Sequence, residues 1–74
     1  MNTSRYQVVT YSRDIGEDER LDYTTKQSAI MAARKHLSTE DSAAVFDRKQ
    51  HRYTAIFGDR WWFESENSRY ANNL

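Results

Sequence analysis

The sequence predicts an α+β fold in which one α-helix packs against an antiparallel sheet of four or five strands. Residues 42–64 contain three short runs of β-branched and aromatic side chains separated by two polar turns, a pattern typical of an antiparallel meander. Residues 5–11 form another such run. Residues 24–37 repeat apolar side chains at helical spacing. The expected order is strand, helix and three strands, with room for one extra short strand before the helix.

Length and composition narrow the possibilities further. The 74 residues suit a single domain, which we place at residues 1–64, with residues 65–74 as a polar tail that frays. No cysteine is present, so disulfides and cysteine-based zinc sites are excluded. The 11 basic and 11 acidic residues cancel, whereas proteins that hold a nucleic-acid backbone usually carry a positive excess. With no apolar run resembling a signal peptide or membrane span, we expect a cytoplasmic protein without membrane contact.

The first strand is predicted over residues 5–11, which are rich in valine, threonine and tyrosine. Side chains alternate between the faces of a strand. The two sets are therefore Tyr6, Val8 and Thr10 on one face, and Gln7, Val9 and Tyr11 on the other. Because both sets contain apolar groups, we expect both faces of this strand to be covered.

Residues 12–22 interrupt the β-pattern with Gly16 and five acidic residues. One interpretation is a solvated loop, or a hairpin tip that leads into a short strand at residues 20–23. The other interpretation is an acidic docking loop for a basic partner. The acidic residues assigned to protein binding in this second interpretation are Asp14, Glu17, Asp18 and Glu19.

The helix is predicted over residues 24–37, and Thr24 with Gln27 fits a capping box at its start. Its apolar stripe consists of Ala29, Ile30, Ala32, Ala33 and Leu37. The alanines allow this helix to approach a sheet closely. Met31 is expected to point outward.

The meander is predicted as strands over residues 42–47, 52–57 and 60–64. Residues 48–51 form a four-residue turn, and Gly58 with Asp59 suits a two-residue hairpin of type II′. Strict alternation places Tyr53, Ala55 and Phe57 on one face.

One helix covers only one face of such a sheet, so the second apolar face needs another cover. We therefore expect an aromatic surface that binds a protein partner or a second copy of the chain. Its anchors are Tyr53, Trp61 and Trp62.

The chain lacks the motifs of an enzyme. His36 and His51 have no serine or cysteine nucleophile in a recognisable setting, and two glycines cannot form a phosphate-binding loop. The histidines and carboxylates also lack the tight spacing of a metal site. We expect no catalysis, no metal and no cofactor.

These observations predict a small, non-enzymatic protein–protein interaction module, homodimeric or bound to a larger protein. By size and composition it is comparable to the inhibitors and regulators that phages and mobile elements produce. A second interpretation is nucleic-acid binding through a basic hairpin next to the tryptophans. The basic residues in that case are Arg48, Lys49, His51, Arg52 and Arg60.

Overall fold

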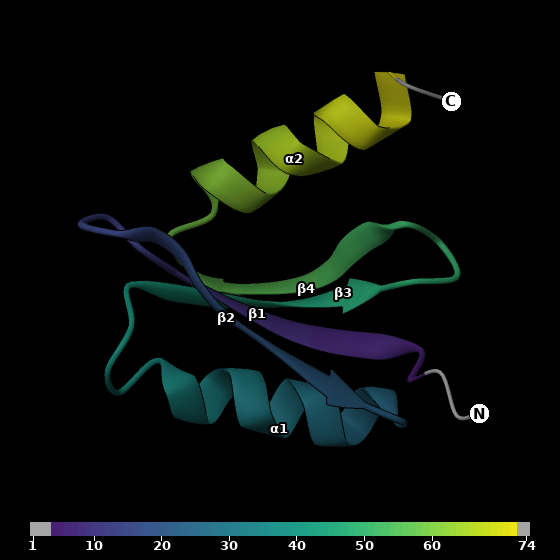
Figure 1. The fold of residues 1–74 in the computed structure, drawn as a ribbon, viewed down its shortest axis with the longest axis horizontal. Helices are drawn as coiled ribbons and strands as arrows, with labels where there is room; N and C mark the ends of the chain where they lie inside the picture. Colours follow the sequence, from purple (N-terminus) through teal and green to yellow (C-terminus); the bar gives the residue numbers. More distant parts are fainter. Residues whose placement is uncertain (1–3, 73–74) are drawn as a thin grey trace.

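A four-stranded antiparallel sheet lies between two helices in the computed structural model, which describes residues 4–72 (Figure 1). In chain order the elements are β1 (Tyr6–Ser12), β2 (Gly16–Tyr23), α1 (Lys26–His36), β3 (Ser42–Asp47), β4 (Arg52–Gly58) and α2 (Trp61–Asn72). The strands are arranged β2-β1-β3-β4. The α+β class and the antiparallel sheet are therefore confirmed, whereas the prediction of a single helix is wrong.

The position of α1 follows from the strand order. Strands β2 and β3 both pair antiparallel with β1, so they run parallel to each other on either side of it. Helix α1 connects β2 to β3 and must therefore cross over β1. This connection keeps α1 against one face of the sheet.

The apolar stripe of α1 packs as predicted. Ala29 and Ala33 are fully buried against Val8 and Val45, while Met31 is 65% exposed. The start of the helix differs by one position from the prediction, because the side chain of Thr25 accepts a hydrogen bond from the Ser28 backbone N–H at 3.2 Å. Thr25, rather than Thr24, is therefore the N-cap.

Helix α2 replaces both the strand predicted at residues 60–64 and most of the polar tail predicted at residues 65–74. The domain boundary predicted at residue 64 falls inside this helix, and residues 73–74 lie outside the described chain. The reason is helical spacing of the side chains that face the sheet: the aromatic Phe63 and Tyr70 and the polar Asn67 share one face. Figure 1 shows α2 on the side of the sheet opposite α1.

Helix α2 therefore covers the second face, which the sequence had suggested was open. The buried residues of this aromatic core are Val9, Tyr11, Ala44, Phe46, Tyr53 and Phe63, with Ile56, Trp62 and Tyr70 packed against them. A β-bulge moves Tyr53 into this core. The register shifts between Val45, which pairs with Ala55, and Phe46, which pairs with Tyr53, so Thr54 is the extra residue. The predicted common face for Tyr53, Ala55 and Phe57 is therefore wrong.

The polar turn at residues 48–51 is present as predicted, but Gly58 does not form a hairpin. Gly58 instead ends β4 before the short link to α2, with a φ of 80°. A Cβ atom at this position would lie 2.5 Å from the Asp41 carbonyl oxygen. Glycine is thus required both by its backbone conformation and by the close approach of the loop before β3.

Candidate protein-binding surface

Three connections meet at one end of the molecule, on the left of Figure 1: the β1–β2 turn, the α1–β3 loop and the β4–α2 link. Arg13 joins them. Its backbone N–H donates to Asp41 Oδ2 at 2.7 Å, and its guanidinium Nε donates to Asp59 Oδ2 at 2.8 Å. The Asp59 backbone N–H also donates to the Asp41 carbonyl at 3.4 Å. We call this region the three-loop end; its hydrogen bonds give it a fixed shape.

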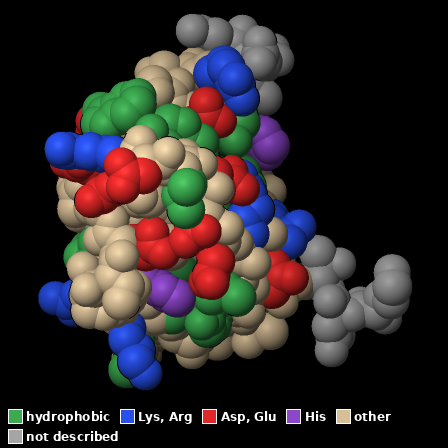
Figure 2. Space-filling view, turned by 60° about the vertical axis from the view of Figure 1, so that its left-hand side comes forward, with side chains coloured by type: hydrophobic (Ala, Val, Ile, Leu, Met, Phe, Trp, Pro, Cys, Tyr) green, Lys and Arg blue, Asp and Glu red, His purple; other side chains and the backbone are tan. Residues whose placement is uncertain are grey.

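Four carboxylates from two separate segments converge at the three-loop end. Asp18 and Glu19 come from β2, and Glu40 and Asp41 come from the α1–β3 loop. We call these four residues the acidic cluster. Figure 2 shows acidic side chains gathered near the centre of this face.

The acidic cluster is electrostatically unfavourable in the isolated protein. The pKa of Glu40 is raised, first because the Asp18 carboxyl hydrogen-bonds to the protonated form, then by partial burial. The negative charges of Asp18, Glu19 and Asp41 raise it further. The fold therefore holds like charges together at a cost to Glu40, while the Arg13 guanidinium lies close enough to interact with the charge of Asp41.

Exposed apolar side chains belong to the same end. Ile15 in the β1–β2 turn is 66% exposed, and Trp61 at the start of α2 is 57% exposed. The Trp61 and Tyr11 rings pack in an edge-to-face arrangement with 5.7 Å between ring centroids. This contact holds the Trp61 ring while more than half of its surface faces solvent. The three-loop end thus combines negative charge with two apolar contact points.

The structure separates the predicted protein-binding residues into different environments. Tyr53 is 1% exposed and Trp62 stacks on Tyr11 at 5.0 Å, so both lie in the aromatic core. Trp61 remains exposed. Glu17 forms an ion pair with Arg20 at 2.8 Å. The remaining three predicted acids, Asp14, Asp18 and Glu19, are exposed on the hairpin, and the last two belong to the acidic cluster.

Sequence reasoning missed Ile15 and the link through Arg13, and it did not include the acidic Glu40 and Asp41 among the predicted binding residues. The hydrogen bond from Arg13 to Asp41 spans 28 positions in the chain. Nothing local in the sequence indicates that pairing. The acidity of residues 14–22 and of Glu40–Asp41 was a usable signal, but the contact between the two segments depends on the folded structure.

Two of the five basic residues considered for nucleic-acid binding are paired with carboxylates. Arg48 donates to Asp22 at 3.0 Å, which compensates its charge. Arg60 lies beyond the other end of β4, where it pairs with Glu64 at 3.2 Å and donates to the Ile56 carbonyl at 3.0 Å. The remaining three, Lys49, His51 and Arg52, lie in or next to the β3–β4 turn.

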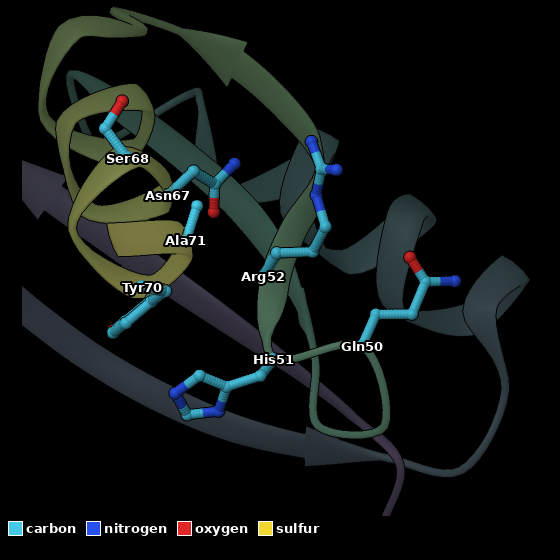
Figure 3. Close-up of a pocket in the computed structure, with 7 residues that line it drawn as sticks. All are labelled: Gln50, His51, Arg52, Asn67, Ser68, Tyr70 and Ala71. Carbon is cyan, nitrogen blue, oxygen red and sulfur yellow. The ribbon is translucent and has the colours of Figure 1, made fainter. Parts of the chain in front are cut away.

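A pocket of about 410 Å³ lies between this turn and the C-terminal half of α2. Its lining residues are Gln50, His51, Arg52, Asn67, Ser68, Tyr70 and Ala71. Figure 3 shows the His51 imidazole directed toward Tyr70 and the Arg52 side chain extending the other way. Because the His51 and Tyr70 rings are 4.6 Å apart, His51 is part of the aromatic packing.

The β3–β4 turn is held by Asp47 rather than by a ligand. Arg5 donates to both Asp47 carboxylate oxygens at 3.0 Å, and the Lys49 backbone N–H donates to Oδ1 at 2.9 Å. These bonds, the Arg5 contact first, hold the pKa of Asp47 below its usual range. The carboxylate is thus engaged in fixing the turn.

Residues 4–72 contain no cluster of three or more histidine or carboxylate side chains arranged to hold a metal ion. Within the same range, neither helix is long and apolar enough to cross a membrane. Comparison of the chain with known protein families, curated proteins and solved structures finds no match.

Proposed function

We propose that this chain is a non-catalytic protein-binding module whose three-loop end docks on a basic surface of a partner protein. The observation that carries the proposal is the acidic cluster, in which two segments distant in sequence bring four carboxylates together. A surface that concentrates one sign of charge is complementary to the opposite charge and accelerates association with it.

The exposed apolar side chains supply binding affinity, which charge alone does not provide. Complementary charge steers a partner and fixes its orientation, whereas buried apolar and aromatic groups provide most of the affinity. Ile15 and Trp61 are both more than half exposed and both belong to the three-loop end. They are the anchors of the proposed interface.

The basic turn is a weaker candidate because two of its five predicted residues are compensated locally. Arg48 pairs with Asp22, and Arg60 pairs with Glu64 at a different place. The acidic cluster, in contrast, holds like charges close enough to raise the pKa of Glu40, although Arg13 lies near Asp41. We therefore favour a basic protein as the partner.

Site-specific photo-crosslinking tests the proposal. A photoreactive amino acid replaces Ile15 in one variant and Lys49, at the β3–β4 turn, in another, and each is exposed to extract from the cells that produce the protein. We expect one discrete partner to crosslink through position 15, and the product to disappear with Glu40→Lys or at high salt. Crosslinking through position 49 alone, insensitive to Glu40→Lys, would contradict the proposal.

The acidic cluster, which we expect to favour partner binding, should also lower the stability of the free protein. Because the pKa of Glu40 is raised in the folded protein, its ionised form weakens folding, and stability is regained as pH falls through that pKa. Glu40→Gln should therefore raise the urea midpoint at pH 7, with a smaller gain at pH 4, while weakening partner capture.

Glu64→Gln is the matched control for this change, since Glu64 forms an ion pair with Arg60 outside the acidic cluster. It should not raise the urea midpoint at pH 7. A Glu40→Gln variant that is destabilised at pH 7 would show that the acidic cluster is a structural feature of the fold instead of a surface kept for binding.

A further inference from the structure

The two edges of the sheet are protected in different ways. Five of the eight residues of the edge strand β2 are charged, namely Glu17, Asp18, Glu19, Arg20 and Asp22. Its pairing with β1 is also irregular between Val9 and Tyr11. Charged side chains and bulges on an edge prevent another strand from pairing with it. The residues of β2 itself therefore protect this edge against pairing with another strand.

The other edge strand, β4, lacks charged side chains between Arg52 and Gly58. Its protection comes from α2. The Tyr53 backbone N–H donates to Asn67 Oδ1 at 2.7 Å, and Asn67 Nδ2 donates to the Tyr53 carbonyl at 3.0 Å. A residue of a neighbouring antiparallel strand exchanges the same two bonds with its partner. The Asn67 amide thus takes the place of a strand at this position.

We propose that β4 is a pairing edge for a second copy of this chain, and that the Asn67 side chain keeps it closed. A hollow of about 280 Å³ lies between the strand and α2, so side chains do not fill this part of the edge. It is lined by Arg52, Tyr53, Thr54, Ile56, Arg60, Glu64 and Asn67. Within the described chain, the Thr54 hydroxyl is buried without a hydrogen-bond partner.

Charge permits pairing between two β4 edges and opposes pairing between two β2 edges. Antiparallel pairing of two β4 strands places their Arg52 side chains at opposite ends, so no like charges oppose each other across the neutral centre. Pairing of two β2 strands would bring their acidic residues together. Two side chains, Asn67 and Arg60, occupy backbone groups of β4, so a competing strand has to displace these contacts.

Asn67→Ala tests this proposal through molar mass and amide hydrogen exchange. Light scattering over a concentration series should give a monomer for the wild type and a doubled mass for Asn67→Ala, unchanged at high salt. The Tyr53 amide should exchange fast in the dilute, monomeric variant and slowly in the dimer. Ser68→Ala is the control. Ser68 is the next residue of α2 and lines the pocket of about 410 Å³ together with Asn67, and this variant should stay monomeric.

Two further variants keep the test decisive. Thr54→Lys added to Asn67→Ala places a charge on the edge and should restore the monomer. If Asn67→Ala fails to fold, Asn67→Asp has nearly the same volume. Its carboxylate still accepts from the Tyr53 N–H but repels the Tyr53 carbonyl, so it should open the edge to a smaller extent. A folded variant that remains monomeric although its Tyr53 amide is unprotected overturns the proposal.

Discussion

The two faces of the sheet are covered by helices of different character. Helix α1 approaches through Ala29 and Ala33, both fully buried, and lies against all four strands. Helix α2 lies mainly against β4 and fills the space above the sheet with Phe63, Trp62 and Tyr70. The first helix is joined at its two ends to β2 and β3, whereas the second follows the last strand of the sheet. The comparison shows that the position of α1 is determined by its connections to β2 and β3, whereas the position of α2 is determined by a few large side chains.

Removal of the central aromatic group of α2 should have the largest effect. Phe63 is fully buried, so Phe63→Ala should reduce the free energy of unfolding by about 3–5 kcal/mol. Urea denaturation measures this loss, and binding of a hydrophobic dye should rise as the aromatic core opens. Met31→Ala, at a position 65% exposed on α1, should change stability by less than about 0.5 kcal/mol. Equal losses for the two variants would mean that α2 is not held by this side chain.

The face of α1 that carries Ala29 and Ala33 should be destabilised by a larger side chain instead of a smaller one. Ala33 has no exposed surface against the sheet, so Ala33→Leu should cost about 1–3 kcal/mol through overpacking. Ala71→Leu makes the same change at an exposed position of α2 and should leave the urea midpoint nearly unchanged. A tolerated Ala33→Leu would show that α1 moves away from the sheet easily, which would remove the difference between the faces.

The smallest predicted effect concerns the Tyr53 hydroxyl, which is buried in the aromatic core without a direct hydrogen bond among the described residues. Burial raises its pKa, so the hydroxyl stays protonated, and the nearby Arg20 guanidinium only partly offsets this shift. Tyr53→Phe should therefore stabilise the protein by about 1 kcal/mol, measured by urea denaturation. A loss of similar size would mean that Arg20 satisfies the hydroxyl after all.

The sequence predicted the regular elements best where local pattern and final packing agree. The alternation of Tyr6, Val8 and Thr10 in β1 and the alanine stripe of α1 both correspond to observed faces. Helix α2 was missed because residues 60–64 have high β-propensity, and its apolar positions after Phe63 reduce to Tyr70 and Ala71. Packing against the sheet decides that segment, and local preference does not reveal it.

The candidate surface was only half predictable for a related reason. Asp18 and Glu19 were visible as members of an acidic run, but Glu40 and Asp41 joined them through tertiary structure. The bulge at Thr54, which carries Tyr53 into the aromatic core, also left no sequence signal, since one extra residue reverses the alternation only when the partner strand is known.

The position of α2 after β4 has a consequence for synthesis of the chain. All four strands emerge from the ribosome before the helix that covers the aromatic face. Until then Val9, Tyr11, Phe46 and Tyr53 have no cover on that side, and the β4 edge lacks Asn67. Nascent chains at this stage expose the apolar surface and unpaired strand that chaperones bind and that promote aggregation. The final helical segment therefore determines how long each new molecule needs protection.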